Sequence, residues 1–293
     1  MKLVSSRRAA LAFVLTAALG ACGGSGDPVE LRATQFGQVN GTDDSLGSGT
    51  YVWKGIPFAK APVDTLRWKA PVDPDAWTTA RDTKAFANAC VQYGRIYGPG
   101  ANNRYDETIG TTLGTSVGSE DCLALNIWRP AGQQTGLPVI VFFHGGSNVS
   151  GYTADPIYDG ARLAKTANAV VVSANFRLGI FGFLKLPQLK TGDANTDSGN
   201  FALLDSIKAL QFVNRNISSF GGDPGNVTIM GQSAGAINVD ALLTSPQMVA
   251  ANPKLFHKAI PLSGGISLAS NLPAGSIPKI GRASCRERVC VPV

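Results

Sequence analysis

Val227-Thr228-Ile229-Met230-Gly231-Gln232-Ser233-Ala234-Gly235 carries the strongest structural signal in this 293-residue chain. A short β-prone run leads into a Gly-x-Ser-x-Gly pentapeptide, and an alanine-rich, helix-prone run follows. Strand, sharp turn and helix in this order lift a serine hydroxyl clear of a sheet, where it can attack a carbonyl carbon. Gly231 and Gly235 fit this geometry because a Cβ at either position would crowd the turn. The pentapeptide alone is a weak signal, so the flanking sequence has to decide.

A second glycine-rich loop lies upstream. His144-Gly145-Gly146-Ser147 follows the apolar run 138–143, which is typical of a buried strand. Such a loop can direct backbone N–H groups at the carbonyl that a serine attacks, and these donors stabilise the oxyanion of the transition state. An ordinary turn would explain a Gly-Gly pair on its own. Beside the strand–serine–helix unit, an oxyanion loop is the better interpretation.

Six segments, the glycine-rich loop among them, stand in an order that is typical of one family. They are Trp53-Lys54-Gly55-Ile56-Pro57-Phe58-Ala59 with Leu66-Arg67-Trp68, Ser119-Glu120-Asp121-Cys122-Leu123 with Leu125-Asn126, His144-Gly145-Gly146, Asn175-Phe176-Arg177-Leu178-Gly179, Gly199-Asn200-Phe201 with Leu203-Leu204-Asp205, and Phe220-Gly221-Gly222-Asp223-Pro224. On these motifs the chain resembles the type B carboxylesterases, which include the cholinesterases. The resemblance covers most of the chain. It implies an α/β-hydrolase fold, a largely parallel central sheet flanked by helices, incomplete at the C-terminus.

Strand and helix patterns alternate along the chain, which favours a parallel sheet with active groups at the carboxyl ends of its strands. The sequence predicts strands at 123–128, 139–143, 169–173, 227–230 and 259–262, and helices at 161–166 and 201–217. Residues 35–55 are expected to form an antiparallel hairpin or meander. Residues 80–118 are loop-rich, and the resemblance places them along one wall of the active-site gorge.

Residues 1–21 are typical of an export signal, with Lys2, Arg7 and Arg8 before a short apolar stretch. Leu19-Gly20-Ala21-Cys22 resembles a bacterial lipobox, so we expect acylation of Cys22 and anchoring to a membrane, in the periplasm or at the cell surface. A plain secretory signal with an incidental cysteine is the alternative. Residues 22–279 are then the N-terminal part of the hydrolase domain. Residues 280–293 resemble a translated sequencing adaptor, and we expect them to be foreign to the gene.

The net charge of +6 would by itself suggest a nucleic-acid or membrane-surface partner. The export signal holds three of the cationic residues, and residues 281–293 hold three more with one glutamate. Residues 22–280 therefore carry 20 Lys and Arg against 19 Asp and Glu. Nucleic-acid binding thereby loses its main support, and we expect no nucleic-acid partner. We expect no metal or cofactor, and a small carboxylic ester as the substrate.

Cys90 and Cys122 remain once Cys22 and the cysteines of the tail are set aside. An even pair in an exported protein favours a disulfide, and the family has a bridge at the matching positions. Two free buried thiols are the alternative. The resemblance also implies two buried ion pairs around the gorge, joining Arg67 to Glu120 and Arg177 to Asp205.

The resemblance places the nucleophile at Ser233 and the oxyanion donors on the backbone N–H groups of Gly146, Ser147 and Ala234. Gly145, Gly231, Gly235, Gln232 and His144 are the expected supporting residues. The chain departs from the family at three of these neighbouring positions. Ser147 stands where the family commonly has Gly or Ala, Asn148 where it has an aromatic residue, and Gln232 where it frequently has glutamate.

A serine nucleophile needs a histidine base and a carboxylate, which follow it along the chain in this fold. After Ser233 the chain offers only Asp240, His257 and Glu287. Glu287 lies in the foreign tail, and Asp240 is expected to point away along a helix. His257 precedes a strand, so a strand's length of well over 10 Å, at about 3.3 Å per residue, should separate it from Ser233. We therefore expect an incomplete triad and little activity from this chain alone.

These observations predict a serine carboxylic-ester hydrolase that acts through a Ser233 acyl-enzyme. A non-catalytic, cholinesterase-like binding protein is the alternative from another class. It is disfavoured because such proteins usually lose the nucleophile, whereas Ser233 and its glycines are intact. A lipase or thioesterase of the same fold is a narrower alternative among enzymes.

Overall fold

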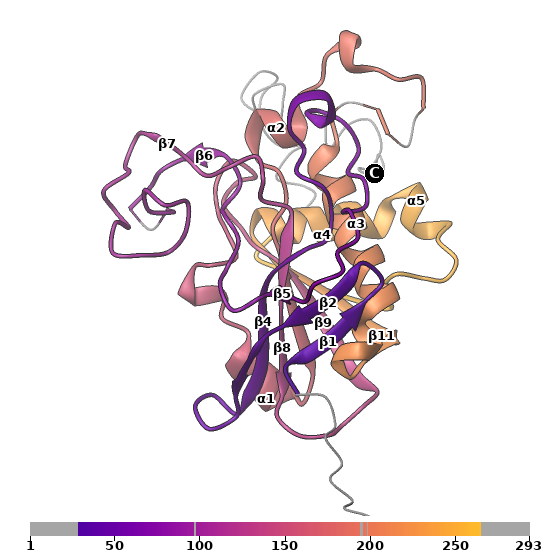
Figure 1. Cartoon of the computed structure of the whole chain (residues 1–293). Helices are drawn as coiled ribbons and strands as arrows, with labels where there is room; N and C mark the ends of the chain where they lie inside the picture. The colour runs from indigo at the N-terminus through magenta and orange to yellow at the C-terminus, as the bar shows by residue number, and fades with distance from the viewer. Residues whose placement is uncertain (1–28, 97, 194–195, 198, 265–293) are drawn as a thin grey trace, which may run out of the picture.

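The computed structural model describes residues 29–96, 98–193, 196–197 and 199–264 (Figure 1). The expected export signal, Cys22 and the tail at 280–293 lie outside these residues. The fold is built on a seven-stranded sheet with the order β12-β11-β9-β10-β8-β4-β3. Its strands are β3 (Thr42–Asp44), β4 (Thr50–Pro57), β8 (Ala124–Pro130), β9 (Leu137–Phe143), β10 (Val170–Ala174), β11 (Gly222–Gln232) and β12 (Lys258–Leu262).

The sheet is mixed. β10, β9, β11 and β12 run parallel to one another and form the half that the strand–helix alternation predicted. β8, β4 and β3 add an antiparallel half, since β3 and β4 form a hairpin within the predicted meander and β4 pairs with β8. Hairpin-connected strands need no helical crossover, so antiparallel pairing extends the sheet on this side. β12 lies at the other edge, where most of its residues are exposed.

The helices are α1 (Ala161–Ala167), α2 (Gly179–Phe183), α3 (Phe201–Asn216), α4 (Ala234–Thr244) and α5 (Pro246–Val249). Single turns of 3₁₀ helix occur at Asp64–Leu66, Pro156–Tyr158, Pro187–Leu189 and Ile217–Phe220. Among the described residues, no helix combines the length and apolar character needed to cross a bilayer.

Side chains of β10 alternate between two buried clusters, as the pleat of a strand requires. Val170 and Val172 pack in the large cluster that includes Leu210 of α3. Val171, between them, packs in a second cluster with Ala164 of α1. Helices therefore cover both faces of the parallel half, which explains why every residue of β10 is buried.

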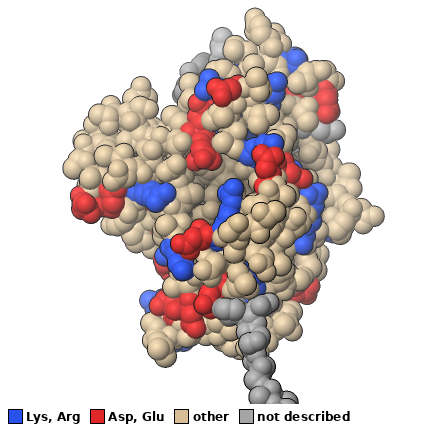
Figure 2. Space-filling model, viewed as in Figure 1, with Lys and Arg blue, Asp and Glu red and all other residues tan. Residues whose placement is uncertain are grey.

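A lobe of loops with β6 (Gln92–Tyr93) and β7 (Ser116–Val117) projects from one side of the large sheet (Figure 1). A smaller sheet joins β1 (Leu31–Thr34), β2 (Gly37–Asn40) and β5 (Arg81–Asp82). Acidic and basic side chains are interspersed on the face that Figure 2 shows, without a broad patch of either sign.

Candidate active site

Ser233 lies at the sharp turn between β11 and α4. Its φ of 55° and ψ of −119° are a conformation that non-glycine residues rarely adopt. The turn is held by backbone hydrogen bonds. Ser233 N–H donates to the carbonyl of Leu262 at 2.8 Å, and the Ser233 carbonyl accepts from the N–H groups of Ala236 and Ile237. The residue is half-buried and lies just after the carboxyl end of β11.

The two glycines of the pentapeptide are required by close backbone contacts. A Cβ on Gly231 would collide with the carbonyl of Gly235, on the first turn of α4. A Cβ on Gly235 would collide with the carbonyl of Phe143 and lie 2.6 Å from that of His144. Both positions therefore require glycine, because the backbone of the serine turn packs directly against the backbone of α4 and of the end of β9.

The loop after β9 lies directly against this turn. A Cβ on Gly145 would lie 3.2 Å from Ser233 Cβ and 2.9 Å from the carbonyl oxygen of Gln232. Gly146, Ser147 and Asn148 then have φ values of 112°, 56° and 57°. The carbonyl of Gly146 accepts hydrogen bonds from the N–H groups of Val149 and Ser150, at 3.1 and 3.0 Å. The loop is a tight turn beside Ser233, with Gly146 partly exposed and Ser147 exposed.

His144 supports the start of this loop. Its buried ring stacks on Phe176, with centroids 4.4 Å apart and planes inclined by 15°. Its Nδ1 lies 2.8 Å from the carbonyl of Gly145 and must donate, since a carbonyl only accepts. Burial lowers the pKa of His144 from 6.5 to about 4, so the ring is neutral at pH 7.

Tyr158 is a neighbour of the loop that the sequence analysis missed. Burial raises the pKa of its hydroxyl, and the nearby backbone N–H of Gly145 partly offsets this rise. Its ring lies 6.2 Å from that of His144 and 5.2 Å from that of Phe142. No local pattern marks this residue, because it comes from the 3₁₀ turn Pro156–Tyr158, well after the loop.

A pocket of about 440 Å³ opens between the loop and the projecting lobe. Its lining includes Gly145, Gly146, Tyr152, Asp155 and Tyr158 from the β9 side, and Gln92 and Leu113 from the lobe. Burial raises the pKa of the Asp155 carboxyl. The pocket therefore reaches the glycine-rich loop at Gly145 and Gly146.

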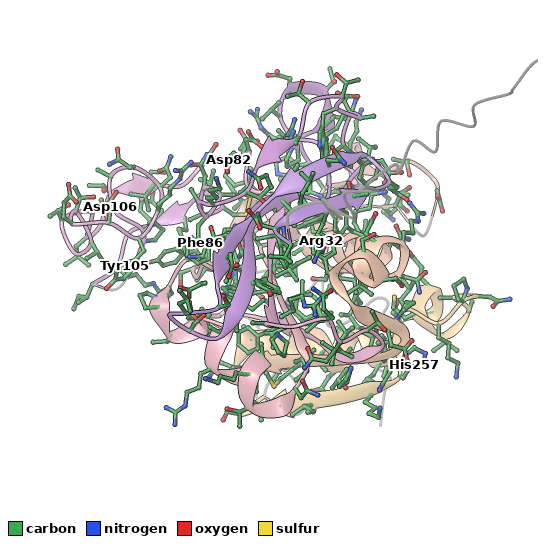
Figure 3. The ribbon with its side chains drawn as sticks, turned by 60° about the horizontal axis from the view of Figure 1, so that its bottom comes forward. Arg32, Asp82, Phe86, Tyr105, Asp106 and His257 are labelled. Atoms are coloured by element: carbon green, nitrogen blue, oxygen red, sulfur yellow. A yellow bond between two sulfur atoms is a disulfide. The ribbon has the colours of Figure 1, made fainter. Side chains whose placement is uncertain are left out.

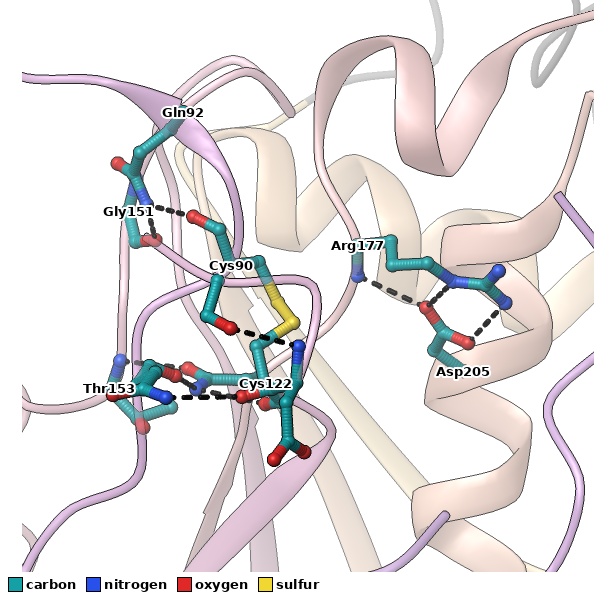
Figure 4. Close-up of a disulfide and its surroundings, with 11 residues drawn as sticks. Cys90, Gln92, Cys122, Gly151, Thr153, Arg177 and Asp205 are labelled. Carbon is teal, nitrogen blue, oxygen red and sulfur yellow. Dashed lines mark hydrogen bonds and ion pairs between the residues drawn. A yellow bond between two sulfur atoms is a disulfide. The ribbon is translucent and has the colours of Figure 1, made fainter. Parts of the chain in front are cut away.

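The Cys90–Cys122 disulfide closes the base of the lobe (Figure 4). Gln92, two residues on, donates to the carbonyl of Gly151 at 2.9 Å and accepts from its N–H at 2.9 Å. The lobe is thereby attached to the segment that follows the glycine-rich loop. The bridge that the resemblance implied thus holds one wall of the pocket.

Both ion pairs that the resemblance implied are present. Arg177 donates to Asp205 from its backbone N–H, Nε and Nη2, at 2.7–3.0 Å, and both side chains are buried (Figure 4). Arg67 donates to Glu120 through Nε and Nη2 at 2.6 Å. The expectation that this pair is buried was wrong, because its side chains lie near the surface and are 35% and 19% exposed. Arg177 also donates to the carbonyl of Lys69, which joins the segment after the 3₁₀ turn Asp64–Leu66 to the ion pair with α3.

His257 is far from the site. Its Nδ1 accepts from the N–H of Val227, and its own N–H donates to the Val227 carbonyl, midway along β11 and six residues before Ser233. Figure 3 shows it across the molecule from Tyr105 and Asp106 of the lobe. Asp240 lies farther along α4, where burial raises its pKa. The described residues therefore give Ser233 no histidine within hydrogen-bond distance, and no three His, Cys, Asp or Glu side chains among them gather into a metal site.

Comparisons with known proteins agree with this geometry. The chain is 41% identical over 235 residues to para-nitrobenzyl esterase of Bacillus subtilis, covering 80% of this chain and 44% of the relative. It is 41% identical over 270 residues to fumonisin B1 esterase of Sphingopyxis macrogoltabida, covering 90% and 46%. The chain thus spans about half the length of the curated relatives that it matches.

Solved structures give the same fold. A thermophilic pNB esterase superposes with a TM-score of 0.69 at 39% identity, covering 81% of this chain and 45% of the other. A carboxylesterase of Geobacillus stearothermophilus superposes with a TM-score of 0.66 at 33% identity, covering 87% and 53%. These neighbours identify the architecture as an α/β-hydrolase fold. The family model described as "Carboxylesterase family" matches residues 28–283, and the chain belongs to this family.

Proposed function

We propose that the protein encoded by the complete gene hydrolyses small carboxylic esters through an acyl-enzyme on Ser233. The observation that carries this proposal is the position of Ser233, on a strained turn with Gly145 against its Cβ. The names of the relatives, among them para-nitrobenzyl esterase and fumonisin B1 esterase, support ester substrates as a class.

In the proposed reaction, Ser233 Oγ attacks the carbonyl carbon of the ester and loses its proton to a base. The N–H groups of Gly146, Ser147 and Ala234 hold the oxyanion of the tetrahedral intermediate. Collapse of this intermediate expels the alcohol, which takes up the proton, and leaves the acyl group on Ser233. Water then attacks the acyl carbon and releases the acid.

The base and its carboxylate are not among the described residues. A serine hydroxyl without its histidine is a weak nucleophile. We therefore propose that residues 29–264 bind and orient an ester but turn it over far more slowly than the complete gene product. Export through residues 1–21 and anchoring at an acylated Cys22 remain part of the proposal, supported by the sequence alone.

The test compares the complete gene product with its Ser233→Ala variant on p-nitrophenyl acetate, following p-nitrophenolate by absorbance. We expect hydrolysis that saturates with substrate, and a fall of kcat by at least about 10³-fold in the variant. Hydrolysis that survives the substitution would overturn the assignment of the nucleophile. A folded protein with no hydrolysis of any ester tested would favour the non-catalytic binding protein.

A further inference from the structure

Asn148 joins three segments that meet at the candidate site. It follows Gly146 and Ser147 as the third residue of the run with positive φ. Its carbonyl accepts a hydrogen bond from the N–H of Gly179, at the start of α2, at 2.7 Å. Its side chain reaches in another direction, to Asn238 of α4. The end of the tight turn is therefore fixed by its backbone and by its side chain.

The two side-chain amides form a reciprocal pair. Asn148 Nδ2 donates to Asn238 Oδ1 at 3.2 Å, and Asn238 Nδ2 donates to Asn148 Oδ1 at 2.9 Å. Asn238 is only 2% exposed, so its amide needs a partner inside the protein. A carboxamide supplies one donor and one acceptor side by side, and two of them satisfy each other only in a narrow range of positions. The pair therefore fixes the spacing between the turn and α4.

The spacing between the turn and α4 sets the distance between the two groups of proposed oxyanion donors. Gly146 and Ser147 directly precede Asn148, whereas Ala234 precedes Asn238 by one turn of α4. The donors must be held together to within about 0.5 Å for the oxyanion to contact all of them. We infer that Asn148 and Asn238 are positioning residues that set the geometry of the oxyanion hole through their paired amides. This inference rests on the proposed function of Ser233.

A role in folding alone would lower stability and leave the chemistry of the folded enzyme intact. A role in positioning would act on the transition state, because only there does the carbonyl oxygen carry the charge that the donors hold. The two roles differ in kcat and in the affinity for a transition-state analogue. They also differ in whether the two residues act as one unit.

The experiment uses the complete gene product with Asn148→Ala, Asn238→Ala and the double variant, assayed on p-nitrophenyl acetate. We expect each single variant to lose about 10- to 100-fold in kcat, with KM changed by no more than about twofold. The double variant should be no slower than the slower single variant. The Ki of a trifluoromethyl ketone should rise in step with the loss of kcat/KM.

Asn226→Ala is the matched control, because its amide also accepts a hydrogen bond, from Lys258 at 2.6 Å, but lies in the middle of β11, seven residues before Ser233. It should keep the kcat of the wild type. Single effects that multiply, or a rise of KM with kcat unchanged, would overturn the inference. If Asn238→Ala does not fold, the test rests on Asn148→Ala, because Asn148 lies on a partly exposed loop. A wild-type kcat in that variant would reject the positioning role of the two amides. Activity that survives Ser233→Ala would instead reject the proposed function.

Discussion

Replacing Gly145 by alanine tests the contact between the glycine-rich loop and the serine turn. The added Cβ would lie 2.5 Å from Oε1 of Gln232, 2.9 Å from the Gln232 carbonyl oxygen and 3.2 Å from Ser233 Cβ. The amide of Gln232 can rotate away, but the carbonyl and the Ser233 Cβ belong to the turn itself. The loop must therefore move away from Ser233.

The size of the effect follows from these distances. Carbon atoms in contact prefer separations of about 3.5–4.0 Å, so relief of the contacts needs a shift of roughly 0.5 Å. A shift of this size is about the tolerance of a catalytic constellation. Loss of one oxyanion donor reduces kcat by about 10²–10³-fold. We expect Gly145→Ala to lower kcat by about 10²-fold, with little change in KM.

The assay is steady-state hydrolysis of p-nitrophenyl acetate by the complete gene product, with the melting temperature measured in parallel. Gly225→Ala is a suitable control, because Gly225 is exposed and its added Cβ would meet only the carboxylate of Asp223, at 3.1 Å. The control should keep wild-type kcat. A folded Gly145→Ala variant with wild-type kcat would show that the loop does not set the chemistry at Ser233.

Three further outcomes are expected. Asp205→Ala leaves the buried guanidinium of Arg177 without its carboxylate and should lower the free energy of unfolding in urea by about 3–5 kcal/mol. The control, Asp75→Ala, breaks an exposed pair with Lys60 and should lower it by under about 1 kcal/mol. Equal losses in the two variants would contradict this. His144 takes up a proton near pH 6.5 when unfolded but only near pH 4 when folded, so its contribution of about 3 kcal/mol should be present above pH 6.5 and disappear as the pH falls to 4. His144→Phe should remove this part of the pH dependence, and an unchanged profile would argue against a neutral ring. Replacing Cys90 and Cys122 by serine opens a loop with a sequence separation of 32 residues and should lower the free energy of unfolding by about 3–4 kcal/mol. It should also raise KM, because the lobe lines the pocket. An unchanged KM would show that the lobe takes no part in substrate binding.

The serine turn and the glycine-rich loop could be predicted from the sequence because local rules govern both. The turn is defined within a few residues by a strand, a glycine-flanked serine and a helix-prone run. The structure shows that a Cβ at position 231 or 235 would collide with neighbouring backbone, so that only glycine fits there. The helix predicted at 201–217 is found at Phe201–Asn216, since its apolar spacing reports burial directly. Boundaries set by pairing were less accurate, as β11 begins at Gly222 through a register shift against β9.

Contacts between distant segments were not predicted. Asn148 and Asn238 are 90 residues apart, and neither belongs to a pattern that would announce the other. The contact between the rings of His144 and Tyr158 joins the loop to a turn whose position depends on the packing of the whole region. The antiparallel half of the sheet was likewise missed, because the sequence indicates a meander at 35–55 and a strand at 123–128 but not that the two pair with each other. The resemblance, rather than any spacing, supplied the Arg67–Glu120 pair.

Covalent labelling of Ser233 tests most directly whether this residue is the nucleophile. The complete gene product would be treated with a fluorophosphonate, and the modified peptide identified by mass spectrometry. The account predicts one adduct, on the Ser233 hydroxyl, formed in step with the loss of ester hydrolysis. Hydrolysis that persists without an adduct, or an adduct on another residue that accompanies inactivation, would contradict it.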